Sequence, residues 1–117
     1  MSDSHQTRAQ QLIGDFAPKL VDLTDSVLFG DVWEWEELSP KDCSLVTVTS
    51  LITSGSTDQL RGHLARARAN GLTATELKEV IIHLAFYAGW PKAMSAITLA
   101  KEVFAAADYS AGLREHT

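Results

Sequence analysis

The sequence is poor in the residues and patterns that several classes of protein require. It has one cysteine in 117 residues, which excludes an intramolecular disulfide and leads us to expect a cytoplasmic protein. No apolar run approaches the roughly 20 residues needed to cross a bilayer, so we expect no membrane partner. Ten basic residues against 15 acidic ones give a net charge of −5, which argues against binding to nucleic acid.

Strand signals are scarce, whereas signals for the ends of helices are frequent. We therefore predict an all-α protein, a single domain over residues 1–117 with about six helices. Two N-terminal helices would occupy 1–28, the core about 29–104, and a frayed tail 108–117. The expected helices span 4–16, 18–30 (ended by Gly30), 40–55, 56–70, 75–88 and 91–107, with an ordered connection over 30–40.

Three of these helices begin at recognisable signals. The Ser-Pro pair at 39–40 predicts an N-cap followed by proline at the first helical position. The patterns S-T-D-Q and T-A-T-E predict two capping boxes, one pairing Ser56 with Gln59 and the other pairing Thr73 with Glu76.

The helix expected over 75–88 has apolar residues on two sides and a polar stripe between them. At about 100° per residue, its main apolar face holds Leu77, Val80, Ile81, Leu84 and Ala88. Glu79, His83 and Tyr87 recur at every fourth position and therefore stack along one side, while Ile82 and Phe86 lie on the remaining side. We infer that one apolar side packs on the protein's own core and the other on a partner subunit or a pocket wall.

A second histidine, His63, lies at the margin of an apolar face in the preceding helix. Antiparallel neighbouring helices could bring His63 and His83 into one cavity. Histidines at the edge of a core are commonly structural, so two hypotheses stay open. Either the histidines are chemical groups, or Glu79, His83 and Tyr87 form a buried network at a subunit interface.

Patterns for several other chemistries are missing. There is no H-x-x-x-H pair, cysteine cluster, glycine-rich phosphate loop or G-x-S-x-G elbow. Glu79 and His83 could supply two metal ligands, but a Glu–His pair at this spacing is more often a simple hydrogen bond. We therefore predict no metal and no cofactor. Cys43 has no second thiol to resolve a redox reaction, and we interpret it as a half-buried residue without a chemical role.

Two long stretches, "LSPKDCSLVTVTSLITSG" and "QLRGHLARARANGLTATELKEVIIHLAFYAGWPKAMSAI", closely resemble the carboxymuconolactone decarboxylase family. The resemblance runs from about Phe29 to Phe104, which is most of the chain. It implies an all-helical, alkylhydroperoxidase-like fold that assembles as a homotrimer or homohexamer. This expectation agrees with the helix that has two apolar sides.

The family has two branches, and the resemblance places this sequence in one of them. The alkylhydroperoxidase-like branch carries a C-x-x-C motif followed by a histidine. Here His63 keeps the histidine, but Ser56 and Gln59 occupy the positions of the two thiols. Peroxidase chemistry by a dithiol mechanism is therefore excluded, and the sequence resembles the decarboxylase-like branch.

One departure from that branch concerns the substrate. Its members typically read R-D-R-S-L before the buried helix, whereas this sequence reads K-D-C-S-L. Lys41 keeps the first basic residue, and Cys43 replaces the second. An arginine at that position could bind a carboxylate through two hydrogen bonds, which a cysteine cannot do.

The resemblance implies a cofactor-independent enzyme that converts 4-carboxymuconolactone into 3-oxoadipate enol-lactone, or acts on a related small substrate. We assign catalytic roles to His83 as proton or hydrogen-bond donor, His63 as ligand of the oxyanion or a carboxylate, Tyr87 as second donor and Glu79 as the group that fixes the tautomer of His83. The expected substrate-binding residues are Trp33, Trp35, Lys41 and Trp90. The alternatives are another small-molecule reaction in an accessory or biosynthetic pathway, or a non-catalytic oligomeric binding protein.

Overall fold

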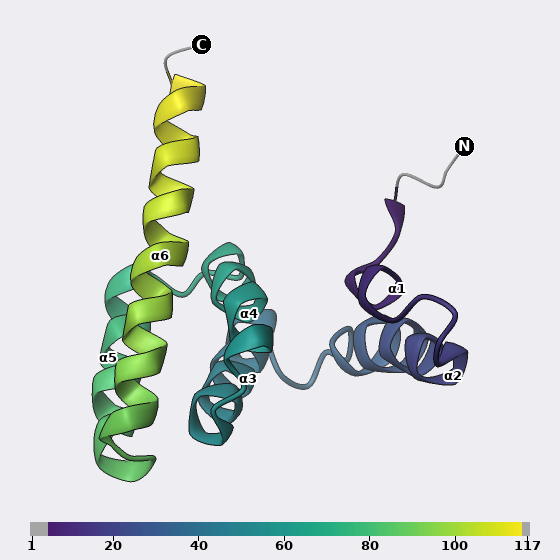
Figure 1. Cartoon of the computed structure of the whole chain (residues 1–117), viewed down its shortest axis with the longest axis horizontal. Coiled ribbons are helices and arrows are strands. Elements are labelled where there is room, and N and C mark those ends of the chain that lie inside the picture. Colours follow the sequence, from purple (N-terminus) through teal and green to yellow (C-terminus); the bar gives the residue numbers. More distant parts are fainter. Residues whose placement is uncertain (1–4, 116–117) are drawn as a thin grey trace. The chain divides into compact units, whose positions relative to one another are not determined.

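The computed structural model describes the backbone of residues 5–115 and the side chains of residues 5–108. Within that range every regular element is a helix, which confirms the predicted all-α class. In chain order the elements are α1 (Arg8–Ile13), α2 (Pro18–Asp22), the π-helix η2 (Leu23–Val32), α3 (Pro40–Ser54), α4 (Thr57–Ala69), α5 (Ala74–Tyr87) and α6 (Trp90–Glu115) (Figure 1). They form two compact units, residues 1–40 and residues 41–117.

In the first unit, the opening helix is shorter than the predicted range 4–16. Thr7 caps α1 because its hydroxyl accepts a hydrogen bond from the Gln10 N–H (3.1 Å), while the Gln10 side chain accepts one from the Thr7 N–H (2.7 Å). Gly14, at φ +57°, ends the helix. Ser4, the predicted start, lies outside the described residues.

The prediction that Gly30 ends the second helix is wrong, because the π-helix η2 continues through it to Val32. The wider turn is visible in the bond from the Trp33 N–H to the Leu28 carbonyl, five residues back (2.9 Å). A Cβ at Gly30 would lie 2.9 Å from the carbonyl oxygen of Asp25, a distance that side chains essentially never adopt. Glycine is therefore needed here for close backbone approach and not as a helix stop.

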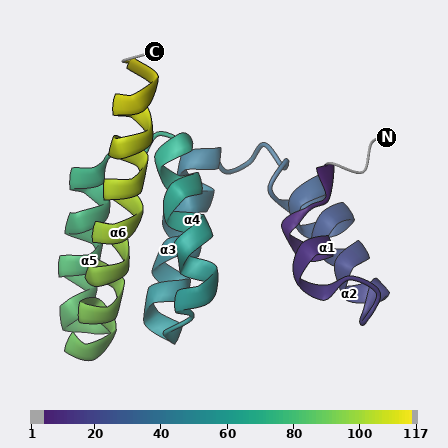
Figure 2. The same cartoon turned by 45° about the horizontal axis from the view of Figure 1, so that its top comes forward.

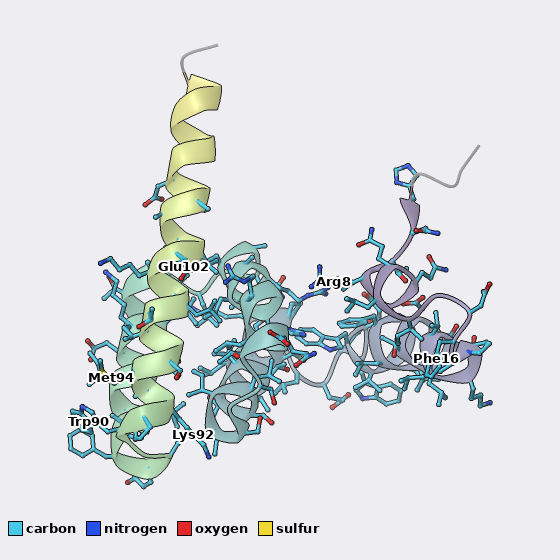
Figure 3. All side chains as sticks on the ribbon, viewed as in Figure 1. Arg8, Phe16, Trp90, Lys92, Met94 and Glu102 are labelled. Carbon is cyan, nitrogen blue, oxygen red and sulfur yellow. The ribbon has the colours of Figure 1, made fainter. Side chains whose placement is uncertain are left out.

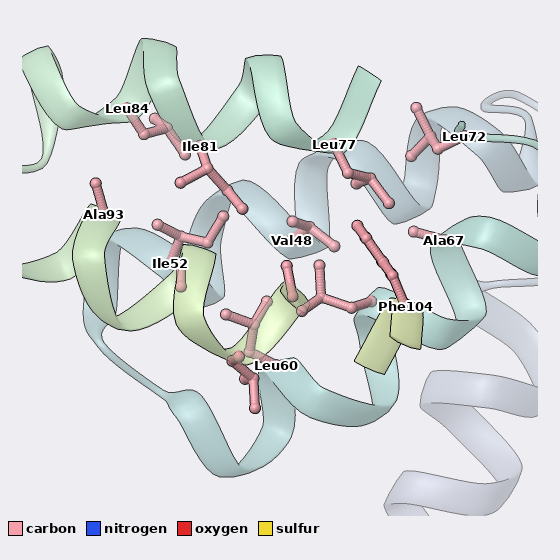
Figure 4. Packing of buried hydrophobic residues seen from close by; sticks show 14 of the residues in the cluster. Val48, Ile52, Leu60, Ala67, Leu72, Leu77, Ile81, Leu84, Ala93 and Phe104 are labelled. Carbon is pink, nitrogen blue, oxygen red and sulfur yellow. The ribbon is translucent and has the colours of Figure 1, made fainter. Parts of the chain in front are cut away.

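The second unit consists of α3 to α6. The long helix α6 packs against both α4 and α5, and it runs beside α5 in the views of Figures 1 and 2. The apolar side chains buried between these helices form one cluster that extends from Val48 to Phe104 (Figure 4). Leu60, Leu64 and Leu77 are completely buried in it. Burying one such side chain contributes about 1.5–3 kcal/mol, so this cluster is the main source of stability that the structure shows.

The helix boundaries in this unit match the prediction closely, except at the end of α6. The predicted Thr73–Glu76 capping box is confirmed, but the predicted Ser56–Gln59 box is wrong. The Ser56 hydroxyl is hydrogen-bonded to the Ser54 hydroxyl (2.8 Å) and makes no cap hydrogen bond.

The last helix is longer than the predicted range 91–107. Helix α6 continues past Ala107 to Glu115. The helix reaches position 107 through three consecutive alanines, which favour helix, and no proline follows to stop it.

Candidate functional site

The polar stripe predicted on α5 lies on the exposed side of that helix. The opposite face is buried through Leu77, Ile81, Leu84 and Ala85. The capping box fixes the start of α5, and the buried face fixes its rotation about its own axis. Glu79, His83 and Tyr87, spaced four residues apart, therefore face solvent.

His83 and Tyr87 form a stacked pair on this exposed side. Their ring centroids are 5.0 Å apart and their planes are inclined by 27°. Tyr87 is 79% exposed, so its hydroxyl group is accessible to a ligand. Glu79 lies one turn earlier and is exposed, and no hydrogen bond joins these two described side chains, Glu79 and His83. The stack thus combines an imidazole and a phenol that can donate hydrogen bonds to the same small molecule.

His63 has a different environment on α4. It is half-buried, and its Nδ1 atom is fully buried. Burial, and secondly the positive charge of Arg66, hold the pKa of His63 below its ordinary value of 6.5. His63 is therefore mainly neutral at pH 7, and a neutral imidazole carries one N–H donor.

Lys41, the retained basic residue, lies at the start of α3 and forms an ion pair with Glu76 in the first turn of α5 (3.8 Å). The pKa of Glu76 is lowered mainly by the hydrogen bond from the Thr73 N–H, with a smaller contribution from the Lys41 charge. Glu76 therefore stays ionised and shares the ammonium group of Lys41 with any ligand that approaches it.

The three tryptophans that were predicted to bind substrate are divided between the two units. Trp90 begins α6 and meets Phe86 edge to face, with ring centroids 5.5 Å apart (Figure 3 labels Trp90). Trp33 is half-buried and stacks on Phe29 at 5.8 Å within the first unit. Trp35 is exposed in that unit. The structure thus brings together His83 with Tyr87, Lys41 with Glu76, and Trp90 with Phe86.

Two features of the second unit were missed by the sequence analysis. Ser44 is buried beside Cys43 and accepts a hydrogen bond from the Asn70 side chain (3.0 Å), which ties the start of α3 to the end of α4. A cavity of about 150 Å³ lies among α3, α4 and α6. Its lining includes Ile52, Gly55, Thr57, Leu60, Lys92 and Ser95, and neither candidate histidine lines it.

One sequence signal could have drawn attention to that cavity. Acidic residues are preferred in the first turn of a helix, where the backbone N–H groups create a positive end. The first turn of α6 contains no acid and carries Lys92. The sequence predicted the start of this helix at position 91, but the unusual cation at the next position was not interpreted.

Among the described side chains, residues 5–108, no group of three histidine, cysteine, aspartate or glutamate residues is arranged to hold a metal ion. None of the helices in this part of the chain is long and apolar enough to span a membrane.

Comparison with known proteins adds the evolutionary context. Residues 18–102 match the profile of the carboxymuconolactone decarboxylase family. The chain is 36% identical over 104 residues to the 4-carboxymuconolactone decarboxylase of Acinetobacter baylyi, covering 89% of this chain and 78% of that protein. It is also 31% identical over 74 residues to the nitrosuccinic acid decarboxylase npaB of Metarhizium robertsii, covering 63% of this chain and 52% of that protein.

Proposed function

Because the chain belongs to the carboxymuconolactone decarboxylase family and is a carboxy-lyase, we propose that it converts 4-carboxymuconolactone into 3-oxoadipate enol-lactone without a cofactor. The Acinetobacter relative that covers most of the chain bears the name of this activity. The structural observation that supports the proposal is the exposed His83–Tyr87 stack, which offers two proton-bearing groups on one helix face.

The chemistry explains why no cofactor is needed. The bond between the ring carbon and the leaving carboxylate breaks, and its electron pair moves through the double bond onto the lactone carbonyl oxygen. Carbon dioxide leaves and a dienolate remains, which then takes one proton at carbon. The protein must bind the anionic substrate, donate hydrogen bonds to the developing oxyanion and deliver that proton.

The residues divide these tasks according to their environments. His83, exposed and stacked, delivers the proton, and Tyr87 is the second donor. Glu79 is four residues from His83 and would fix its tautomer once a ligand orders both side chains. His63, neutral at pH 7, donates its single N–H to the oxyanion or to a carboxylate.

The proposed binding groups complete this arrangement. Lys41 binds a substrate carboxylate in competition with Glu76. In this role Lys41 replaces in part the arginine that the family pattern has at position 43. Trp90, together with Phe86, supplies an apolar surface beside the stack. Trp33 and Trp35 are proposed as further apolar wall residues that exclude water.

Histidine variants test the proposal. We expect His83→Asn and His63→Asn each to lower kcat by about 10²-fold or more, since loss of a general acid or its hydrogen bonds has effects of that size. His5→Asn, an exposed histidine in the first unit, is the matched control and should keep full activity. The measurement is loss of lactone in steady-state assays. Unchanged turnover in both variants, with folding preserved, would refute the acid–base roles.

A second substrate class is favoured by the cysteine at position 43 and by the fungal relative. That relative is named for nitrosuccinic acid, which also carries a carboxylate next to a group that can accept electrons. A nitro group takes the electron pair as a nitronate, just as the unsaturated lactone takes it as a dienolate. If the wild-type protein turns over nitrosuccinate and not the lactone, the first substrate is wrong while the carboxy-lyase chemistry is retained.

We also propose that the protein works in the cytoplasm as a homotrimer or homohexamer. Support comes from the second apolar side of α5, where Phe86 is 75% exposed and Ile82 is 51% exposed. Phe86 contacts the exposed Trp90, which lies with the exposed Met94 at the start of α6 (Figure 3). Phe86→Glu should lower the mass measured by analytical ultracentrifugation, because a charge would be buried in the interface. Lys78→Glu, elsewhere on α5, is the control. A wild-type protein that sediments as a monomer would contradict the proposal.

A further inference from the structure

The cavity among α3, α4 and α6 has two chemically different parts. Its lining includes buried apolar side chains, among them Ile52 and Leu60, which belong to the core. It also includes three exposed polar residues, Thr57 and Ser95, which bear hydroxyl groups, and Lys92. A ligand that fits it must therefore have an apolar body and a polar group at one end.

The size of the cavity limits the apolar body. Its volume is about 150 Å³. An apolar cavity of about this size in a protein core accommodates a benzene molecule. The body of the ligand is therefore one six-membered ring or a chain of similar bulk.

The position of Lys92 determines the charge of the polar end. Its side chain reaches from the start of α6 towards the turn between α3 and α4, where its Cε atom lies 3.9 Å from the place that a Cβ of Gly55 would occupy (Figure 3). Lys92 takes part in neither the Lys41–Glu76 nor the Arg61–Glu102 ion pair. Asp58, the acid in the first turn of α4, is not among the residues that line the cavity. The cation and the two hydroxyls favour an anion with several acceptor oxygens.

We propose that this cavity binds a small organic acid, with one carboxylate on a benzene-sized apolar body, at a site separate from the histidine stripe. The carboxylate lies against Lys92 and the hydroxyls of Thr57 and Ser95, and the apolar body fills the space against Ile52 and Leu60. This assignment does not depend on the proposed decarboxylase activity, because none of the residues assigned to that activity lines the cavity.

Benzoate is the probe that tests this site, with benzyl alcohol as its uncharged counterpart of nearly the same size. The full chain is titrated with each compound while amide chemical shifts are followed by NMR. We expect saturable benzoate shifts centred on Gly55, Thr57 and Ser95, with a dissociation constant on the order of 1 mM for a ligand of about nine heavy atoms. Benzyl alcohol should bind about tenfold more weakly.

Lys92→Met keeps the length of the side chain and removes its charge, and Lys101→Met on the same helix is the matched control. Lys92→Met should weaken benzoate about tenfold and leave benzyl alcohol unchanged, whereas Lys101→Met should change neither. The proposal is overturned if benzoate gives no saturable shifts at the cavity residues. Equal binding of the two probes, or no effect of Lys92→Met, would overturn the carboxylate assignment.

Discussion

Residues 1–40 and residues 41–117 build helices with the same local devices but bury very different amounts of apolar surface. Each unit contains a complete threonine capping box, at Thr7 and at Thr73. Among the described residues of the first unit only Ala9 is buried, whereas Phe16, Leu20 and other large apolar side chains are exposed. The second unit has a continuous core. Local hydrogen bonding thus shapes the helices in both units, but burial stabilises only the second.

Charge separates the two units as well. Residues 1–40 contain eight acidic and two basic residues, whereas residues 41–117 contain seven acidic and eight basic ones. The first unit therefore carries a net charge of −6 and the second one of +1, which together give −5. The basic residues that could attract an anionic substrate, Lys41 and Lys92 among them, belong to the second.

A pair of leucine truncations should give the largest difference between the units. Leu64→Ala in the core should lower the free energy of unfolding by about 2–5 kcal/mol, because it leaves a cavity that the neighbouring helices cannot close. Leu20→Ala, at a side chain 53% exposed, should lower it by about 1 kcal/mol or less. Urea denaturation measures both values. Similar losses would mean that residues 1–40 bury Leu20 in the assembled protein, and the comparison would then fail.

The two capping boxes give a smaller and sharper test. Thr73→Ala removes the N-cap of α5, which carries much of the core, and should lower the free energy of unfolding by about 1 kcal/mol. Thr7→Ala removes the same hydrogen bond from a six-residue helix with one buried residue and should have a much smaller effect. Thermal denaturation of the two variants makes the comparison. A larger loss for Thr7→Ala would indicate that its hydroxyl, which also donates to Asp25, supports more structure than the burial shows.

The smallest expected effect is the contribution of His63, in the second unit, to the pH dependence of stability. The unfolded chain protonates His63 near the ordinary pKa of 6.5, whereas the folded protein does so only at lower pH, because burial and Arg66 oppose the cation. Below pH 6.5 the unfolded state therefore binds more protons. The contribution of neutral His63 to stability is complete above pH 6.5 and is lost as the pH falls through the folded pKa.

His63→Asn should flatten that part of the pH dependence. Denaturation curves for the wild type and the variant, recorded on both sides of pH 6.5, measure the difference. His5→Asn serves as the control in the first unit. Parallel curves for wild type and His63→Asn would contradict the assignment of this titration to His63.

Much of the second unit could be predicted from sequence because its helix ends are chemically marked. Pro40 and Thr73 mark helix starts, and Gly55, Gly71 and Gly89, all with positive φ, mark the turns between helices. These signals act within a few residues of the chain. The same reasoning failed at Gly30, whose role is a close contact inside a π-helix, and at Ala107, where no stop signal exists.

The candidate site could be predicted only in part, for a related reason. The exposure of His83 and Tyr87 follows from the helical repeat, so their stacking was foreseeable. The half-burial of His63 and the position of Lys92 beside Gly55 depend on how separate helices pack, which periodicity does not specify. The roles of these residues in catalysis stay predictions until the variants are assayed.

The length of α6 has a consequence for how the protein fluctuates. Among the side chains that the structure describes in this helix, Phe104 is the last buried one, and the backbone stays helical to Glu115, about 16 Å further at the usual rise per residue. Near Ala96 and Ala100 the backbone amides are shielded by the core, and we expect their hydrogen exchange to require opening of the whole unit. The next four residues, 105–108, are exposed, so we expect their amides to exchange by local opening of the helix. Along this one helix, hydrogen exchange is therefore expected to change from requiring global unfolding to requiring only local opening.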